Sequence, residues 1–248
     1  MRLSHKLKKL TDPRTARSAR QHLGRVLLAR RLVFRVDPQR IIASIDREGF
    51  AAIHRRHAVE NPGQTWRKYL DLQRWMPINL RRVRGLKLDY GRKRRILDIG
   101  SGAGYFLYIC KWFRHEVVGL DLDIVPMYAE MARLLGLKRV IWRIQPFVPL
   151  PDLGGKFDLI TAFMICFNNH NRPDLWAVPE WDFFLTDAAQ HLKPGDQLHL
   201  EFNWERDGTF MSDELRKFFE SRGATVQENQ VTFAAGPRPS RLIEAMRG

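Results

Sequence analysis

Alternate glycines that follow a carboxylate form the segment of this sequence best suited to chemistry. The glycines are Gly100, Gly102 and Gly104, and the carboxylate is Asp98. Glycine lets the backbone turn sharply and lets a ligand approach without a Cβ in the way. The segment 94–99, in which Ile96, Leu97 and Ile99 are apolar, predicts a buried strand before this turn, and a helix is expected after it. This order of strand, turn and helix places backbone amides where they can face a ligand.

The spacing of these glycines separates two classes of cofactor. The dinucleotide fingerprint has glycine at its first, third and sixth positions. Counted from Gly100, glycine stands here at the third and fifth positions, and the sixth position is Tyr105. The Asp98 carboxylate would repel a pyrophosphate, but it would attract an ammonium group. The segment therefore favours S-adenosylmethionine, which carries such a group on its amino acid part, over NAD.

A second carboxylate, Asp121, stands at the end of the next expected strand. It follows Gly100 by 21 residues. An acidic side chain at this spacing can accept hydrogen bonds from both hydroxyls of a ribose. The alternative is an aspartate that simply meets solvent at the end of a strand.

The pattern of apolar residues divides the chain in two. Residues 64–248 form the main domain, and residues 1–63 form an amino-terminal extension. In the domain, helices of about ten residues alternate with strands, which predicts an α/β fold with a mostly parallel sheet and helices on both faces. The expected strands are 94–99, 115–120, 139–144, 157–163, 197–202, 225–228 and 231–234.

The extension is basic and is expected to be helical. Residues 1–95 contain 26 Lys or Arg and 7 Asp or Glu, out of 42 and 27 in the whole chain. An amphipathic helix is expected over 20–36 and a second helix over 39–57, before a turn at 61–63. The first could lie on a membrane surface, pack on the domain or meet a partner. The positive charge favours an anionic partner, which could be nucleic acid, acidic lipid or an acidic substrate. The alternative is a solvated helical surface that only aids solubility.

Several segments in order resemble the motif series of class I S-adenosylmethionine-dependent methyltransferases. They are 98–104, Asp121, 157–163 and 192–196, and the resemblance covers about residues 94–235. The stretch 66–170 also resembles uncharacterised bacterial methyltransferase-domain proteins of polysaccharide clusters. The resemblance implies a Rossmann-like sheet of seven strands. It also implies that the methionine part of the cofactor meets Asp98 and the glycines, and that the ribose meets Asp121.

The resemblance also places the adenine beside the segment that follows the third strand. Many relatives have an acidic residue there, whereas this chain has Gln145 and Pro146. The side-chain oxygen of Gln145 would then accept from the adenine amino group. The full set of expected cofactor-binding residues is Asp98, Gly100, Ser101, Gly102, Gly104, Tyr105, Asp121, Leu122, Gln145, Pro146 and Phe163.

The segment after the fourth strand is expected to lie beside the reactive methyl group. It contains His170 as a candidate general base, with Asn168 and Asn169 to orient the acceptor; a plain loop histidine is the alternative. Glu201 and Asn203 are further candidates. Trp66, Tyr69 and Trp75 either cover the pocket or belong to the core.

The absence of other motifs narrows the expected chemistry. No Asn-Pro-Pro-Tyr sequence follows the fourth strand, and the cysteines, Cys110 and Cys166, do not form a nucleophilic pair, so an oxygen acceptor is favoured. No His, Cys and Asp spacing predicts a metal site.

The function expected first is O-methylation of a small molecule or of a glycan or lipid precursor. The alternatives are an RNA methyltransferase that grips phosphates with its basic region, and a non-catalytic cofactor-binding module. A basic stripe that leads to the cofactor cleft would favour RNA. The sequence lacks an apolar run of spanning length and a secretion signal, which favours a cytoplasmic protein, with peripheral contact to the inner membrane face as an option.

Overall fold

The computed structural model describes residues 36–165 and 175–239. The chain forms two compact units, one up to Arg40 and one from Ile41 to Gly248. The second unit is built on a seven-stranded sheet with the strand order β3-β2-β1-β4-β5-β7-β6. The expected Rossmann-like α/β architecture is therefore confirmed.

The first five strands run parallel, and β7 lies antiparallel between β5 and β6. The strands are β1 (Arg95–Ile99), β2 (Glu116–Asp121), β3 (Lys138–Ile141), β4 (Phe157–Ile165), β5 (Leu192–Phe202), β6 (Thr225–Gln227) and β7 (Gln230–Phe233). All seven expected strands are present, with ends that differ by a few residues. Because the strand order reverses between β1 and β4, a crevice opens at their carboxyl ends, where such folds bind ligands.

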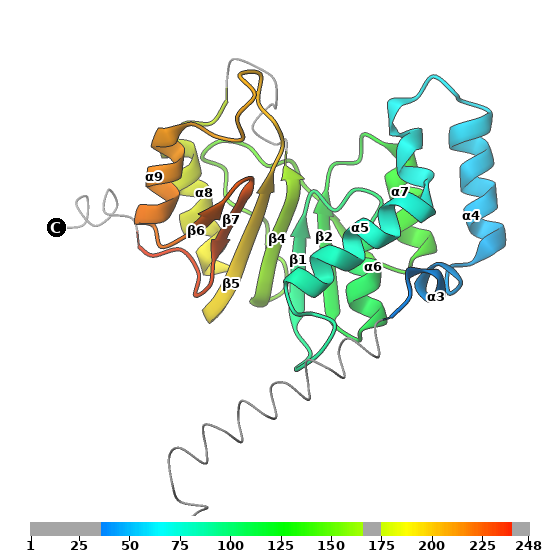
Figure 1. Ribbon diagram of the computed structural model, residues 1–248, viewed down its shortest axis with the longest axis horizontal. Coiled ribbons are helices and arrows are strands. Elements are labelled where there is room, and N and C mark those ends of the chain that lie inside the picture. The colour runs from blue at the N-terminus through cyan, green and yellow to red at the C-terminus, as the bar shows by residue number, and fades with distance from the viewer. Residues whose placement is uncertain (1–35, 166–174, 240–248) are drawn as a thin grey trace, which may run out of the picture. The chain divides into compact units, whose positions relative to one another are not determined.

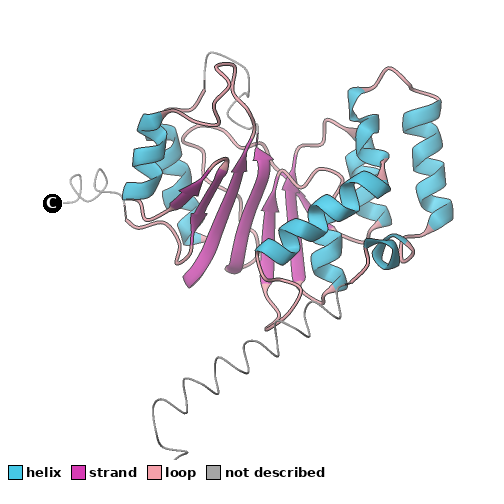
Figure 2. Ribbon diagram, in the orientation of Figure 1, coloured by secondary structure: helices cyan, strands magenta, loops and turns pink. Residues whose placement is uncertain are grey.

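Helices cover both faces of the sheet (Figure 1; Figure 2). The helices of the domain are α5 (Leu72–Gly85), α6 (Tyr105–Trp112), α7 (Pro126–Leu134), α8 (Val178–Gln190) and α9 (Asp213–Ser221). Figure 1 shows α8 and α9 on the side of β5 to β7, and α5, α6 and α7 on the opposite side.

The core beneath α8 and α9 is aromatic. Trp181 is fully buried, and its ring lies 5.3 Å from the ring of Phe202 and 5.4 Å from that of Phe219. Phe219 in turn faces Phe233 of β7. Aromatic pairs of this kind add to the stabilisation that burial itself provides. The helices α8 and α9 do not line the crevice, but their aromatic core stabilises the sheet at whose end the crevice lies.

The segment 41–63 packs on the domain. The expected helix 39–57 is divided into α3 (Pro38–Ile42) and α4 (Arg47–His54), because Asp46 ends the connecting turn and accepts from the amide of Glu48 at 3.1 Å, as an N-cap. A π-helical turn, η1 (Arg55–Val59), continues α4.

Glu130 of α7 joins this segment to the rest of the domain. Its carboxylate accepts from Arg56 at 2.6 Å and lies 3.2 Å from Nε2 of His57. The expected boundary at residue 63 therefore differs from the structure, in which the compact unit begins at Ile41. The amphipathic segment 20–36 that the sequence predicts lies outside the described residues except for its last one.

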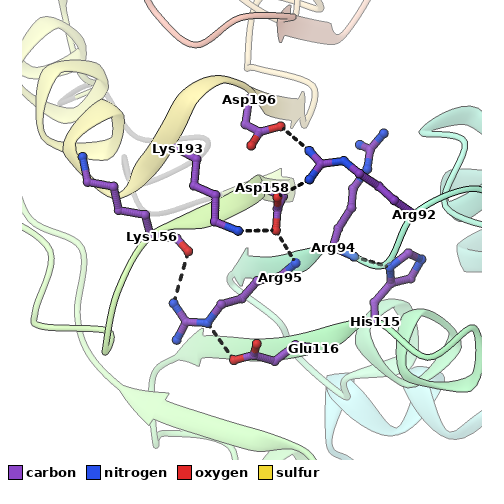
Figure 3. A network of polar contacts seen from close by, with 9 residues as sticks. All are labelled: Arg92, Arg94, Arg95, His115, Glu116, Lys156, Asp158, Lys193 and Asp196. Carbon is purple, nitrogen blue, oxygen red and sulfur yellow. Dashed lines mark hydrogen bonds and ion pairs between the residues drawn. The ribbon is translucent and has the colours of Figure 1, made fainter.

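The amino-terminal ends of the strands are held by an ion network around Asp158 (Figure 3). Its buried carboxylate accepts from Arg92 at 2.9 Å, from Lys193 at 2.9 Å and from the amide of Arg95 at 2.7 Å. Burial raises the pKa of this carboxyl, but its hydrogen bonds and the positive charges of Lys193 and Arg92 together outweigh burial and hold the pKa below its usual value. The network joins β1, β4 and β5 at the edge opposite the crevice.

Candidate functional site

A cavity of about 800 Å³ lies at the carboxyl ends of β1, β2 and β4. Its walls come from the glycine turn, from the end of β2, from α5 and from the segment that precedes α5. Most of the expected cofactor-binding residues line it, namely Asp98, Gly100, Ser101, Gly102, Gly104, Tyr105, Asp121, Leu122 and Phe163. The structure thus brings together residues that are up to 65 positions apart in the sequence.

The glycine turn adopts the backbone conformation for which glycine is needed. Gly100, Gly102 and Gly104 have φ angles of 73°, 53° and 80°. At Gly104, a Cβ would collide with the side chain of Leu137. The amide of Gly100 donates to the carbonyl of Leu120 at 2.7 Å, which ties the turn to β2. The turn therefore presents its backbone, without side chains, to the cavity.

Asp121 faces the turn from the end of β2. One carboxylate oxygen accepts from the amide of Gly102, and the other accepts from the amide of Leu122 at 2.6 Å. Burial raises the pKa of this carboxyl, and the two amides oppose that effect. Each carboxylate oxygen retains a lone pair, so Asp121 can still accept from the two hydroxyls of a ribose.

Asp98 is the deepest charged group of the cavity. It is 3% exposed, and its carboxylate accepts from the hydroxyl of Thr161 at 2.7 Å. Burial raises the pKa of Asp98 to about 7, against the hydrogen bond from Thr161 and the positive charge of Arg82. A cationic ligand group beside such a buried carboxylate lowers its pKa again and so stabilises the ionised form.

An ion pair in the cavity wall did not follow from the sequence. Arg82 of α5 donates to both carboxylate oxygens of Glu201, from Nε at 3.1 Å and from Nη2. Its guanidinium also lies 4.4 Å from the ring centroid of Phe163. Arg82 lines the cavity. The only sequence signal was an arginine on the expected helix before the first strand.

A short helical segment, η2 (Thr65–Leu70), covers part of the cavity. The hydroxyl of Tyr105 donates to the carbonyl of Tyr69 at 2.5 Å, and the ring of Tyr69 contacts the rings of Trp75 and Tyr128 at 4.9 and 5.8 Å. Tyr69 and Trp75 line the cavity, whereas Trp66 does not. Two of the three aromatic residues expected as a cover therefore take that place.

The segment after β3 differs from the expectation. The third strand ends at Ile141, so Trp142, Arg143 and Ile144 form the wall on this side. Gln145 and Pro146 are exposed and are not among the lining residues. The early end of the strand shifts the wall by a few residues, and the sequence pattern alone did not locate that end.

A further wall of the cavity is formed where β4 and β5 end. Met164 and Asn203 line it, and the side chain of Asn203 donates to the carbonyl of Met164 at 2.7 Å. Glu201 is turned toward Arg82. The expected catalytic residues His170, Asn168 and Asn169 lie outside the described residues, as does Cys166.

Two other titratable groups, His199 of β5 and Cys110 of α6, are buried and are not among the residues that line the cavity. Burial lowers the pKa of His199 to about 4, and its ring contacts the hydroxyl of Thr232 at 2.8 Å. Burial raises the pKa of the Cys110 thiol, as expected for a core residue. A smaller cavity of about 580 Å³, lined by residues of α4 and η2, contains none of the expected site residues.

Within 36–165 and 175–239, no helix is long and apolar enough to cross a membrane. The same residues contain no group of three or more His, Cys, Asp or Glu side chains that could hold a metal ion.

Comparison with known proteins finds no matching family description and no matching curated protein. Solved structures do match. A structure of an S-adenosylmethionine-bound amino pentose methyltransferase from Micromonospora echinaspora is 24% identical, with 62% of this chain and 57% of that chain covered and a TM-score of 0.40. This chain thus spans little more than half the length of that protein.

Two further solved structures give similar values. A TehB-like S-adenosylmethionine-dependent methyltransferase from Corynebacterium glutamicum is 17% identical over 66% of this chain and 95% of that chain, with a TM-score of 0.47. A methyltransferase from Pyrococcus furiosus is 17% identical over 64% and 83%, with a TM-score of 0.46.

Proposed function

We propose that this chain is a class I methyltransferase that binds S-adenosylmethionine in the cavity at the carboxyl ends of β1, β2 and β4. One observation carries the proposal. Asp98 and Asp121 stand on either side of a glycine turn, and all of them line one cavity. A buried carboxylate matches an ammonium, and a carboxylate at the next strand end matches ribose hydroxyls.

The same arrangement disfavours a dinucleotide. The backbone amides of a glycine turn attract phosphate in dinucleotide-binding proteins. Here the amide of Gly102 is occupied by Asp121, and Asp98 lies in the same cavity wall. Two carboxylates around the turn oppose the approach of a pyrophosphate, whereas they stabilise a cationic ligand.

The remaining wall residues suit the adenine and the transfer step. Trp142 and Ile144 offer apolar surface for the base. Tyr69 and Trp75 limit the access of water from the side of η2. The cofactor supplies an electrophilic methyl group when bound. The contribution of the chain is to align an acceptor with that group and to exclude water, which accounts for most of the catalysis in such reactions.

The acceptor belongs to the proposal as well. We assign it to a hydroxyl of a small molecule or of a glycan or lipid precursor, with His170 as its base and Asn168 and Asn169 as orienting groups.

RNA is the alternative, and the net charge of +15 is the observation that favours it. Against one continuous basic stripe, the described cations are divided: Arg92, Lys93 and Lys193 lie around the amino ends of the strands, whereas Lys68 and Arg143 line the cavity at the opposite ends. A cytoplasmic location, with peripheral contact to the inner membrane face, is part of this proposal and rests on the basic amino-terminal sequence.

Incubation with methyl-labelled cofactor and a fractionated cell lysate tests the function. We expect label in the small-molecule, glycan or lipid fraction, and far less label at the same cofactor concentration when Asp121→Ala replaces the natural chain. Asp123→Ala, which changes an exposed carboxylate two positions away, is the matched control and should label as the natural chain does. Label in RNA would support the alternative acceptor. Label in no fraction, despite cofactor binding, would support a non-catalytic module.

A further inference from the structure

Arg82 places a positive charge in the cavity wall that also contains Asp98. Its side chain is 16% exposed. Its charge acts on Asp98, where it opposes the rise in pKa that burial causes. The amino acid part of S-adenosylmethionine carries an ammonium and a carboxylate, so a matching wall needs one charge of each sign. Asp98 and Arg82 are a pair of this kind.

The hydrogen bonds of Arg82 leave donors for a ligand. Of the five N–H groups of a guanidinium, Nε and Nη2 each use one on Glu201, and Nη1 uses one on Asn79 at 3.2 Å. Within the described part of the chain, one N–H of Nη1 and one of Nη2 remain. Two such groups on neighbouring nitrogens can bind a carboxylate in the bidentate manner that makes arginine pairs strong.

The side chains around Arg82 fix where its guanidinium lies. Glu201 holds one edge with two hydrogen bonds, and Phe163 lies against its face at 4.4 Å. Asn79, one turn earlier on α5, holds a third donor. A side chain fixed on three sides loses little further freedom when it binds a ligand, which favours affinity.

The charges near Arg82 are opposite to that of the ligand. Arg82, Glu201 and ionised Asp98 together carry a net charge of −1, and the zwitterion with its sulfonium carries +1; Asp121, at the end of β2, is assigned to the ribose instead. Other cations of the wall are less suited. Lys68 is exposed and lies over the ring of Tyr69 at 5.1 Å, and Arg143 is exposed beside the segment after β3.

We propose that Arg82 binds the α-carboxylate of the cofactor while Asp98 binds its ammonium, with Glu201 and Asn79 as positioning residues for the guanidinium. The inference rests on the proposed function, since it needs S-adenosylmethionine in this cavity. It adds a determinant of ligand specificity that comes from α5 rather than from the glycine turn.

Titration calorimetry with two ligands tests this role. S-adenosylmethionine carries the carboxylate, and decarboxylated S-adenosylmethionine lacks only that group. For the natural chain we expect the first ligand to bind at least about tenfold more tightly. In Arg82→Gln this preference should fall to about one, because affinity for the first ligand drops while affinity for the second stays within about twofold.

Matched variants separate binding from folding. Arg81→Gln changes the exposed neighbour on the same helix and should keep the full preference. Arg82→Lys keeps the charge and should keep part of it. If Arg82→Gln fails to fold because Glu201 is left unpaired, the double variant Arg82→Gln with Glu201→Gln removes both charges of the pair and is measured instead.

The outcomes distinguish this inference from the proposed function. If Arg82→Gln weakens both ligands equally, Arg82 serves structure alone and the inference is wrong. If the natural chain binds both ligands with equal affinity, the inference is also wrong, while the proposed function stands. If the natural chain binds neither ligand, the proposed function itself fails.

Discussion

The protonation state of Asp98 controls what the cavity can bind. Burial raises its pKa to about 7 in the empty protein. Arg82 opposes this rise, whereas Asp121 and Glu201 add to it. An ammonium can pair only with the ionised carboxylate, so at lower pH binding must first expel a proton.

We therefore expect cofactor affinity to fall by about tenfold between pH 8 and pH 6, as a single group with this pKa requires. Asp98→Asn should bind weakly at both values and should lose the pH step. Calorimetry at the two pH values measures both effects. A natural chain whose affinity is the same at pH 6 and pH 8 would contradict the ammonium assignment.

The same group affects stability with the opposite sign. The folded protein holds the Asp98 proton more tightly than the unfolded chain does. The empty protein therefore loses stability through this group as the pH rises from about 4 to about 7. At pH 8, Asp98→Asn should thus stabilise the protein without ligand by up to about 4 kcal/mol, since burial raises the pKa by about three units, each worth about 1.36 kcal/mol. Thermal unfolding at pH 8 without ligand measures this, and a lower unfolding temperature for the variant would contradict it.

Asp121 is expected to matter for the ribose rather than for the fold. Asp121→Ala removes two acceptor oxygens and should weaken cofactor binding by about a hundredfold or more, the loss expected for two hydrogen bonds to a charged group. Asp123→Ala should bind normally. Titration calorimetry measures the cofactor affinity of both variants. Unchanged affinity in Asp121→Ala would contradict the ribose assignment.

The positions of these two aspartates in the cavity wall could be predicted, because each is fixed by its distance from the glycine turn along the chain. The position of Arg82 could not, since its charge acts on Asp98 only because α5 packs on α6 and Arg82 pairs with Glu201 of β5. Gln145 and Pro146 were expected at the cavity because the third strand was expected to end at 144. The strand ends at Ile141, and no proline or glycine in the sequence marks that end.

At the scale of elements, the start of α6 depends on the shape of one residue. Gly104 is the N-cap of α6 with a φ of 80°, and Leu137 occupies the space a Cβ would need. Gly104→Ala should therefore destabilise the fold by about 2 kcal/mol and weaken cofactor binding. Gly85→Ala is the matched control, because Gly85 ends α5 with open space around its Cα. Urea unfolding measures both, and equal stability of the two variants would show that the turn is not under this constraint.

The helices and strands of the domain were largely predictable, because the spacing of the apolar residues indicates each of them. The exception is the region before the sheet. The expected single helix 39–57 is interrupted before α4 and changes to a π-helical turn at Arg55. The turn at Ala43–Asp46 follows from a cap and from packing on α7, which local periodicity does not report.

At the scale of the whole domain, Glu130 connects the segment 41–63 to the sheet domain. Its carboxylate holds Arg56 and the buried His57. Glu130→Ala should lower the free energy of unfolding by about 1 kcal/mol and should increase cleavage by protease within 41–63, since η1 then loses its polar contacts with α7. Glu220→Ala, an exposed position on α9, is the control. A variant that resists protease as well as the natural chain would show that apolar packing alone holds this segment.

The central claim is that the cavity beside the glycine turn is shaped for a sulfonium nucleoside. The most direct measurement is calorimetric titration of the full chain with S-adenosylmethionine and, separately, with NAD. We expect the first to bind once per chain and the second not to bind. Binding of NAD, or no binding of S-adenosylmethionine at pH 8, would contradict the account.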